Sequence, residues 1–313
     1  MSTTVESEFN SLIGTVVASQ ANYFEVELDD LNKNILMDLN GFDHQKSLRI
    51  LCTRRSRLDH IGTLVSTGDR VWIEAIDWKA CTGVIVKVEP RISWIDRPPV
   101  ANITSLFVVL SLKNPAFDLD QASRFLLTAE KTGLDLHLLL TKTDLMAKNN
   151  VEQMLKRIED WGYEPIPISI KSAEGLDHLK SLFLKKGLAV LCGPSGVGKS
   201  SLLSYFLKKK SIRVGKLSGR LQRGRHTTRH VELYSFATGC YVADTPGFNR
   251  PSLECDPSDL PYLFPEIRSK LNENRCKFRN CLHLDEPGCS IPKTWERYSF
   301  YRNSILEILN SRR

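Results

Sequence analysis

Hydrophobic positions in the first third of the chain fall in short runs that are typical of β-strands. Branched and aromatic residues gather in five such runs, and turn-forming residues separate them, for example the Thr-Gly-Asp sequence at 67–69. The runs cover residues 13–17, 23–28, 47–51, 70–75 and 83–88. Five short strands so closely spaced predict a small β-barrel or sandwich.

The pattern changes after residues 97–99, an Arg-Pro-Pro sequence that predicts a stiff linker. A continuous apolar run over 106–112 predicts a strand buried on both faces. Predicted helices then alternate with predicted strands, which indicates a parallel sheet with helices on both faces. The helices are expected at 121–131, 151–161 and 176–184, and the strands at 136–140, 165–169 and 188–192. Beyond residue 257 the chain holds a cysteine cluster and then a helical stretch at 295–309.

Length and composition agree with this division. The chain has 313 residues, about twice a typical domain, and we predict domains at 1–97, 98–256 and 257–313. Hydrophobic residues make up 42% and charged residues 25%, which argues against a disordered or fibrous chain. No apolar stretch is long enough to cross a bilayer, and the acid-bearing start of the chain is unlike a signal or transit peptide. We therefore expect a cytoplasmic protein with no membrane partner.

The most specific motif is the Gly-Pro-Ser-Gly-Val-Gly-Lys-Ser sequence at 193–200. It fits G-x-x-x-x-G-K-[ST] and lies between the predicted strand 188–192 and an apolar helix, as a phosphate-binding loop requires. The glycines let backbone N–H groups point at phosphate oxygens, and the helix N-terminus favours anions. Lys199 is expected to reach the β- and γ-phosphates and Ser200 to ligate magnesium. The predicted phosphate-binding residues are Gly193, Pro194, Ser195, Gly196, Val197, Gly198, Lys199, Ser200 and Ser201.

A second motif addresses the base of the nucleotide. Thr141, Lys142, Thr143 and Asp144 follow a predicted strand and resemble the Asn-Lys-x-Asp sequence with which GTPases read guanine. The Asp144 carboxylate would accept two N–H bonds from guanine that adenine cannot supply, and the Lys142 stem would lie along the base. Ser169, after the next strand, stands where a short loop contacts the guanine oxygen. The sequence therefore predicts GTP over ATP and disfavours an ATP-dependent kinase.

A third motif predicts a switch. Residues 244–247 fit D-x-x-G, in which Asp244 holds magnesium through water and the Gly247 N–H contacts the γ-phosphate. Upstream, the segment 223–230 is poor in apolar residues, and either Thr227 or Thr228 is expected to complete the magnesium shell. The alternative for that segment is an ordinary basic loop. Because the base-reading motif precedes the phosphate loop, the usual order of GTPase motifs is circularly permuted.

The cysteine cluster has the spacing of metal ligands. Cys276, Cys281, His283 and Cys289 form C-x₄-C-x-H-x₅-C. Three thiolates and one imidazole are a sufficient tetrahedral set for one structural zinc ion, with no open position for catalysis. The alternative, unligated core cysteines, is disfavoured because the intervening residues are mostly polar.

The charge of the chain indicates an anionic partner. The formal net charge is +7, and residues 208–229 contain no Asp or Glu. Nine cations lie in that segment: Lys208, Lys209, Lys210, Arg213, Lys216, Arg220, Arg223, Arg225 and Arg229. Contact with a nucleic-acid backbone is the interpretation we favour over a solvated face. Near the third predicted strand, Arg49, Arg54, Arg55 and Arg57 mark the barrel either as a second nucleic-acid platform or as a solvated edge.

Together these motifs are similar to those of the circularly permuted ribosome-assembly GTPases of the RsgA (YjeQ) family. The resemblance covers nearly the whole chain and rests on GPSGVGKSS, RGRHTTRHVEL, VADTPGF and CKFRNCLHLDEPGC, which start at residues 193, 223, 242 and 276. It implies a multidomain protein with an N-terminal OB-fold β-barrel, an α/β circularly permuted P-loop GTPase domain and a C-terminal, mostly helical zinc-binding domain. It also implies GTP hydrolysis stimulated by the small ribosomal subunit during late maturation of that subunit, through rRNA binding. We expect a monomer that carries one zinc and binds magnesium with GTP.

The residue after the switch motif bears on catalysis. Phe248 follows Gly247, where many GTPases have a glutamine that orients water, so the free enzyme is expected to be slow. The resemblance makes His226 the candidate substitute, which gives a catalytic set of Lys199, Asp244, Gly247 and His226. The alternative function is an RNA-binding, ribosome-associated module that uses its nucleotide site only as a ligand switch.

Overall fold

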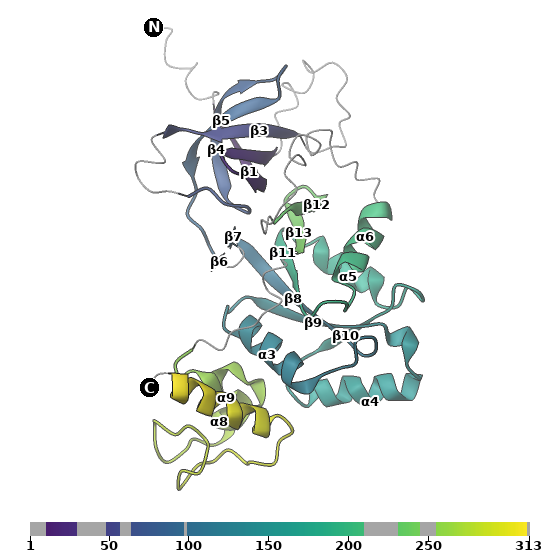
Figure 1. The fold of residues 1–313 in the computed structure, drawn as a ribbon, viewed down its shortest axis with the longest axis vertical. Helices are drawn as coiled ribbons and strands as arrows, with labels where there is room; N and C mark the ends of the chain where they lie inside the picture. The colour runs from purple at the N-terminus through teal and green to yellow at the C-terminus, as the bar shows by residue number, and fades with distance from the viewer. Residues whose placement is uncertain are drawn as a thin grey trace. The chain divides into compact units, whose positions relative to one another are not determined.

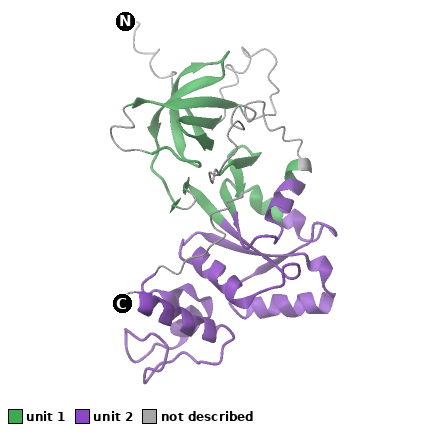
Figure 2. Cartoon of the chain, viewed as in Figure 1, with its two compact units in different colours: residues 1–105, 179–190, 206–247 green, residues 106–178, 191–205, 248–313 purple. Residues whose placement is uncertain are grey.

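The computed structural model describes residues 11–29, 48–56, 64–96, 99–209, 231–244 and 255–311. The chain divides into two compact units, which Figure 2 shows in different colours. One comprises Met1–Ser105, Leu179–Val190 and Phe206–Gly247, and the other comprises Leu106–His178, Leu191–Tyr205 and Phe248–Arg313. The predicted domain boundaries at 97/98 and 256/257 stay a prediction.

The first five strands form a closed barrel (Figure 1). They are β1 Leu12–Gln20, β2 Tyr23–Leu28, β3 Arg49–Arg54, β4 Arg70–Asp77 and β5 Thr82–Val88. Around the barrel the order is β1-β2-β3-β5-β4, and β3 and β5 are parallel while the other pairs are antiparallel. Val26, Ile50, Val71, Ile73 and Ile85 are fully buried inside it. This five-stranded closed barrel confirms the predicted OB-type fold.

Two short strands follow the barrel. β6 Trp94–Asp96 pairs antiparallel with β7 Pro99–Ala101, and Pro99 lies opposite Asp96. The predicted linker at 97–99 is therefore wrong at Pro99. Proline is tolerated as the first residue of a strand because its missing N–H breaks no interior ladder bond there.

The remaining strands form a six-stranded sheet with the order β10-β9-β8-β11-β13-β12 (Figure 1). Their bounds are β8 Ile103–Ser111, β9 Asp135–Thr141, β10 Pro165–Ile168, β11 Gly187–Cys192, β12 Leu233–Ala237 and β13 Cys240–Asp244. β9 and β10 are parallel, as predicted. β12, which the sequence pattern did not reveal, pairs antiparallel with β13, so the sheet is not purely parallel.

The predicted alternation of strands and helices is confirmed. The helices are α3 Leu119–Glu130, α4 Lys148–Glu159, α5 Leu176–Phe183 and α6 Lys199–Lys209, with a 3₁₀ turn, η1, at Thr143–Leu145. The Asp118 carboxylate caps α3 by accepting a hydrogen bond of 2.7 Å from the Gln121 N–H. Among the described residues no helix combines the length and the apolar character that a membrane span requires.

The C-terminal segment contains η3 Leu260–Leu263, α8 Pro265–Glu273 and α9 Tyr298–Ser311. Phe264, Ile267, Tyr301 and Ile305 are buried in one apolar cluster that also includes Leu127 of α3. The mostly helical tail and α3 thus share a core, and this core supports the cysteine cluster described below.

Candidate functional site

The phosphate-loop motif has the strand–loop–helix setting that the sequence predicted. Residues 193–198 connect the end of β11 to the start of α6. Gly193 has a φ of +140°, and a Cβ at this position would lie 2.1 Å from the carbonyl oxygen of Val109 on β8. Only glycine allows this close approach, which brings the loop against the neighbouring strand.

Lys199 lies over this loop. Its side chain is buried, and its Nζ donates hydrogen bonds of 2.7 Å to the Gly193 carbonyl and 2.8 Å to the Pro194 carbonyl. Ser200 is exposed beside it in the first turn of α6. The helix therefore begins with a cation and a hydroxyl, and the N–H groups of its first turn have no carbonyl acceptor within the helix.

Asp144 and Ser169 meet at the carboxyl ends of β9 and β10. Ser169 Oγ donates a hydrogen bond of 2.7 Å to Asp144 Oδ1, and the Ser172 N–H donates one of 3.1 Å to the same hydroxyl. Thr143 Oγ1 donates to Glu174 Oε2 over 2.6 Å. Two predicted base-reading positions that are far apart in sequence are thus in direct contact.

Thr141 and Lys142 contact the phosphate loop. Thr141 Oγ1 lies 2.6 Å from the Val197 carbonyl oxygen, so the threonine that replaces the usual asparagine bonds to the loop backbone. Lys142 has a left-handed backbone, with φ 60°, and its Nζ donates to the carbonyls of Gly196, over 2.8 Å, and Asn114. Lys142 therefore links three segments: the loop that follows β8, the base-reading segment and the phosphate loop.

Sequence reasoning missed the contribution of Asn114. A signal was present, because the Lys-Asn-Pro sequence at 113–115 directly follows the buried run 106–112. Ligands of open α/β sheets bind beyond the carboxyl ends of such strands. The residues after this run were therefore candidates for the site.

A cavity of about 190 Å³ lies among these segments. It is lined by Thr141, Lys142, Asp144, Ile168, Ile170, Lys171, Val197, Gly198, Ser201 and Leu202. The lining combines a carboxylate, apolar side chains and the start of the phosphate-loop helix. This is a suitable surface for a flat heterocycle with hydrogen-bonding edges that is joined to phosphates.

Several predicted residues cannot be placed. His226, Thr227, Thr228, Gly247 and Phe248 lie outside the described residues, as do Arg57 and most of the basic segment 208–229. Asp244 is the last residue of β13, but its side chain is also outside the described part. Their predicted roles stay predictions.

The basic interpretation of the barrel needs a correction at Arg49. This residue lies within β3, and its guanidinium donates to Glu27 over 3.0 Å and to Glu25 over 3.4 Å. Both carboxylates belong to β2 and are buried, so the partly exposed Arg49 is neutralised by two ion pairs. Neither a nucleic-acid platform nor a solvated edge therefore describes Arg49, because strand pairing places two acids beside it.

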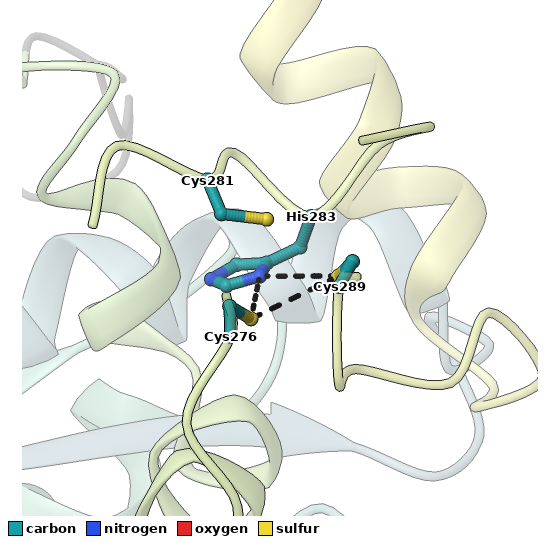
Figure 3. Close-up of side chains that lie close together, drawn as sticks. All are labelled: Cys276, Cys281, His283 and Cys289. Carbon is teal, nitrogen blue, oxygen red and sulfur yellow. Dashed lines mark hydrogen bonds between the residues drawn. The ribbon is translucent and has the colours of Figure 1, made fainter. Parts of the chain in front are cut away.

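The four predicted zinc ligands lie together in the C-terminal segment (Figure 3). Their ligand atoms are all within 4.8 Å of one another. Cys276 Sγ and Cys289 Sγ are 4.0 Å apart, and each lies 3.5 Å from His283 Nδ1. Tetrahedral zinc, with bonds of about 2.3 Å to sulfur and about 2.0 Å to nitrogen, requires sulfur–sulfur and sulfur–nitrogen separations close to these. Cys276, Cys281, His283 and Cys289 therefore fit a zinc ion that is bound through His283 Nδ1.

The surroundings of the cluster favour metal binding. Burial lowers the pKa of His283, which keeps the imidazole in the neutral form that binds metals. Glu286 accepts hydrogen bonds of 2.8 Å from the N–H groups of Leu282 and Leu284, on either side of His283. The Tyr301 hydroxyl on α9 donates to the Leu282 carbonyl over 2.5 Å. These bonds hold the ligand loop against the apolar cluster.

Comparison with known proteins agrees with this geometry. The RsgA GTPase family model matches residues 88–254. A protein of Prochlorococcus marinus (strain MIT 9303) named small ribosomal subunit biogenesis GTPase RsgA is 54% identical, with 96% of this chain and 94% of that protein covered. A protein of the same name from Synechococcus sp. (strain CC9311) is 52% identical, with 95% and 94% covered.

Two solved structures have a similar fold. The crystal structure of YjeQ from Thermotoga maritima is 27% identical with a TM-score of 0.74 and covers 96% of this chain and 99% of that one. The crystal structure of YloQ, a circularly permuted GTPase, is 26% identical with a TM-score of 0.72 and covers 98% of each chain. The matched family model and the similarity along almost the whole length lead to one conclusion: the chain belongs to the RsgA GTPase family.

Proposed function

We propose that this protein hydrolyses GTP to GDP and phosphate, that the small ribosomal subunit stimulates the reaction, and that it acts in late maturation of that subunit by binding rRNA. The observation that carries the proposal is the shared cavity, in which Asp144 of the base-reading motif and Gly198 and Ser201 of the phosphate-loop segment line one space. The curated relatives named small ribosomal subunit biogenesis GTPase support the choice of partner.

Each part of the site has a separate task in this proposal. Asp144 accepts the guanine N–H groups, while Ser169 fixes the orientation of its carboxylate. The backbone N–H groups of residues 193–200 bind the phosphate oxygens, and Lys199 stabilises charge that develops between the β- and γ-phosphates. An ammonium group has three N–H donors, so Lys199 can contact phosphate oxygens while it keeps the Gly193 or Pro194 carbonyl as a partner.

Magnesium is proposed to be held by the Ser200 hydroxyl, by Asp244 through water and by Thr227 or Thr228. Hydroxyl and carboxylate oxygens are the hard ligands that magnesium prefers, and Ser200 is exposed at the start of α6. Bound there, the ion would neutralise phosphate charge. The zinc at Cys276, Cys281, His283 and Cys289 is assigned a structural role, because four protein ligands leave no open position.

Phe248 gives a reason for partner stimulation. A phenyl ring cannot orient the attacking water, so turnover of the free protein should be slow. Improvement of the geometry by a partner, with His226 as the candidate water-orienting residue, would make hydrolysis conditional on the ribosomal subunit. The protein is proposed to act in the cytoplasm as a monomer.

The experiment that tests the proposal measures GTP turnover by the full chain with small ribosomal subunits, with large subunits and with neither. The expected result is stimulation by small subunits alone, together with tight binding of the GTP form and release of the GDP form. If small subunits leave turnover unchanged but bind the protein, the nucleotide site serves as a ligand switch and the proposed reaction is wrong.

A further inference from the structure

A turn between the first two cysteines of the zinc cluster exposes an aromatic side chain. Residues 277–280, here named the Phe278 turn, separate Cys276 from Cys281. Phe278 is 45% exposed. An exposed phenyl ring does not contribute the stabilising free energy that its burial would supply. Phe278 does not belong to the apolar cluster that packs against the zinc ligands.

Backbone hydrogen bonds define the shape of the turn. The Lys277 N–H donates to the Gly288 carbonyl over 3.0 Å, and the Cys281 N–H donates to the Phe278 carbonyl over 3.4 Å. Gly288 has a φ of +76°, and a Cβ there would lie 2.8 Å from Lys277 Cβ, so the opposite strand of the loop packs closely under the turn. A turn whose backbone is already formed loses little conformational entropy when it binds a partner.

Cationic residues flank Phe278 in the sequence. Arg275, Lys277 and Arg279 are exposed, and Lys277 Nζ lies 5.6 Å from the centre of the Phe278 ring. None of the three cations forms an ion pair with an acidic residue in the part of the chain that the structure describes. The turn and the adjacent Arg275 therefore carry three positive charges that no acidic side chain of the described residues pairs with.

The acidic residues near the turn are engaged elsewhere. Glu273 bonds to Lys270 over 3.0 Å, and Asp285 bonds to Lys293 over 2.5 Å. Glu286 accepts the two backbone N–H bonds beside His283. The three cations around Phe278 thus stay available for an anionic partner.

An exposed aromatic ring among unpaired cations has the chemistry of a single-stranded nucleic-acid contact. Bases stack on aromatic side chains, while cations contact the flanking phosphates. An acidic protein surface would satisfy the cations but would not use the ring in this way. We propose that the Phe278 turn binds an unpaired RNA base, with the base stacked on Phe278 and the adjacent phosphates on Lys277 and Arg279. This proposal rests on the proposed function and assigns one part of the rRNA contact of the protein.

The test uses the zinc-loaded full chain and two probes, a single-stranded uridine oligonucleotide and the same sugar–phosphate chain without bases. Phe278→Ala should weaken binding of the oligonucleotide about tenfold and leave binding of the abasic chain unchanged, because only stacking is lost. Phe278→Trp should restore binding. Arg279→Gln should weaken both probes equally and lower the salt slope of log K by about 0.7, the value for one phosphate contact on a single strand.

Zinc content and melting temperature show whether each variant is folded. A folded Phe278→Ala protein that binds the oligonucleotide as tightly as the unaltered chain overturns the proposal, and so does an equal loss on both probes. Weaker binding of intact small subunits with unchanged binding of both probes also overturns it, because the turn would then contact a protein. Stimulation of GTP turnover in the unaltered chain is a separate measurement, so its absence would reject the proposed function independently.

Discussion

Ser169 Oγ donates a hydrogen bond of 2.7 Å to Asp144 Oδ1, although the two residues follow different strands of the sheet. The Ser169 hydroxyl itself accepts a bond from the Ser172 N–H over 3.1 Å, so its direction is fixed by the backbone. The orientation of the Asp144 carboxylate at the edge of the nucleotide cavity is therefore set before any ligand binds. Recognition of the base should depend strongly on Asp144 and weakly on Ser169.

Asp144→Asn should change the preferred nucleotide. The amide loses a charged acceptor for the guanine N–H groups and gains a donor that suits the extra oxygen of xanthine. Loss of two hydrogen bonds to a charged group should weaken GTP binding about a hundredfold or more. Titration with GTP, ATP and xanthosine triphosphate measures this, and Ser169→Ala is the matched control that should still prefer GTP. Equal affinities of the unaltered protein for ATP and GTP would refute the assignment of Asp144.

Lys199→Ala should slow turnover strongly. The change removes the cation from the phosphate loop, and loss of one group that stabilises transition-state charge typically slows an enzyme about 10²- to 10³-fold. Lys185→Ala, which removes an exposed cation outside the loop, is the control and should leave the rate unchanged. Single-turnover GTP hydrolysis measures the effect. A rate for Lys199→Ala within a few-fold of the unaltered protein would contradict the predicted role.

The cysteine cluster should bind one zinc ion per chain. Structural zinc supplies about 10 to 16 kcal/mol of apparent binding free energy at neutral pH, so a chelator or Cys281→Ser should unfold the ligand loop. Burial raises the pKa of Cys52 and of Cys192 to about 12, which leaves both thiols protonated and slow to alkylate at pH 8. They serve as internal controls, whereas the cluster thiols should become reactive on chelation. Metal analysis without zinc, together with free alkylation of the cluster before chelation, would exclude the site.

Local sequence patterns predicted the parts of the site that depend on short spacing. The phosphate loop at 193–200 and the zinc ligands each lie within a short segment, and their chemistry follows from which residues are neighbours in sequence. The alternation of apolar runs with helical patterns was likewise sufficient for the central strands, because both their faces are buried. These local patterns did not predict the order of the strands around the barrel.

Contacts between distant segments could not be predicted in this way. Arg49 is neutralised by Glu25 and Glu27 because β2 and β3 pair in one register, and sequence alone does not specify that register. β12 is short and lies at the edge of the sheet, so its pattern was too weak to detect. Arg297 is fully buried and paired with Glu266. The sequence did not reveal this, because arginine is almost never fully buried unless it has a partner.

Glu232 should make stability depend on pH. Burial, followed by repulsion from Glu25, raises the pKa of this carboxyl, and Arg49 lowers it only partly. A carboxyl with a raised folded-state pKa contributes most to stability below its unfolded value, about 4.3, and that contribution is lost as the pH rises through the folded value. Glu232→Gln should therefore raise the melting temperature at pH 7.5, and the gain should vanish near pH 4. Glu152→Gln, which changes an exposed residue of α4, is the control. If the gain in melting temperature of Glu232→Gln is the same at every pH, the charge of Glu232 does not cause it.

Arg297 joins the C-terminal segment to the end of α4. Its side chain is fully buried, with its guanidinium carbon 4.8 Å from the ring centre of Trp161 and 4.9 Å from that of Phe264. Arg297 Nε donates to Glu266 over 2.7 Å, and Nη2 donates to the second carboxylate oxygen. The aromatic rings replace water around this ion pair, so removal of one partner leaves a charge in an apolar environment.

Arg297→Met should lower the free energy of unfolding by about 3 to 5 kcal/mol, the usual cost of an uncompensated buried charge. Arg297→Met combined with Glu266→Gln should recover much of the loss, because the stranded carboxylate is removed. Arg124→Gln breaks the ion pair with Glu307, in which the Arg124 side chain is 36% and the Glu307 side chain 52% exposed. This change should cost less than about 1 kcal/mol. Urea denaturation measures all three variants. If the double variant is as unstable as Arg297→Met alone, packing of the long side chain, rather than charge pairing, holds the segment to α4. If Arg297→Met costs as little as Arg124→Gln, neither the packing nor the charge pairing of Arg297 holds the segment.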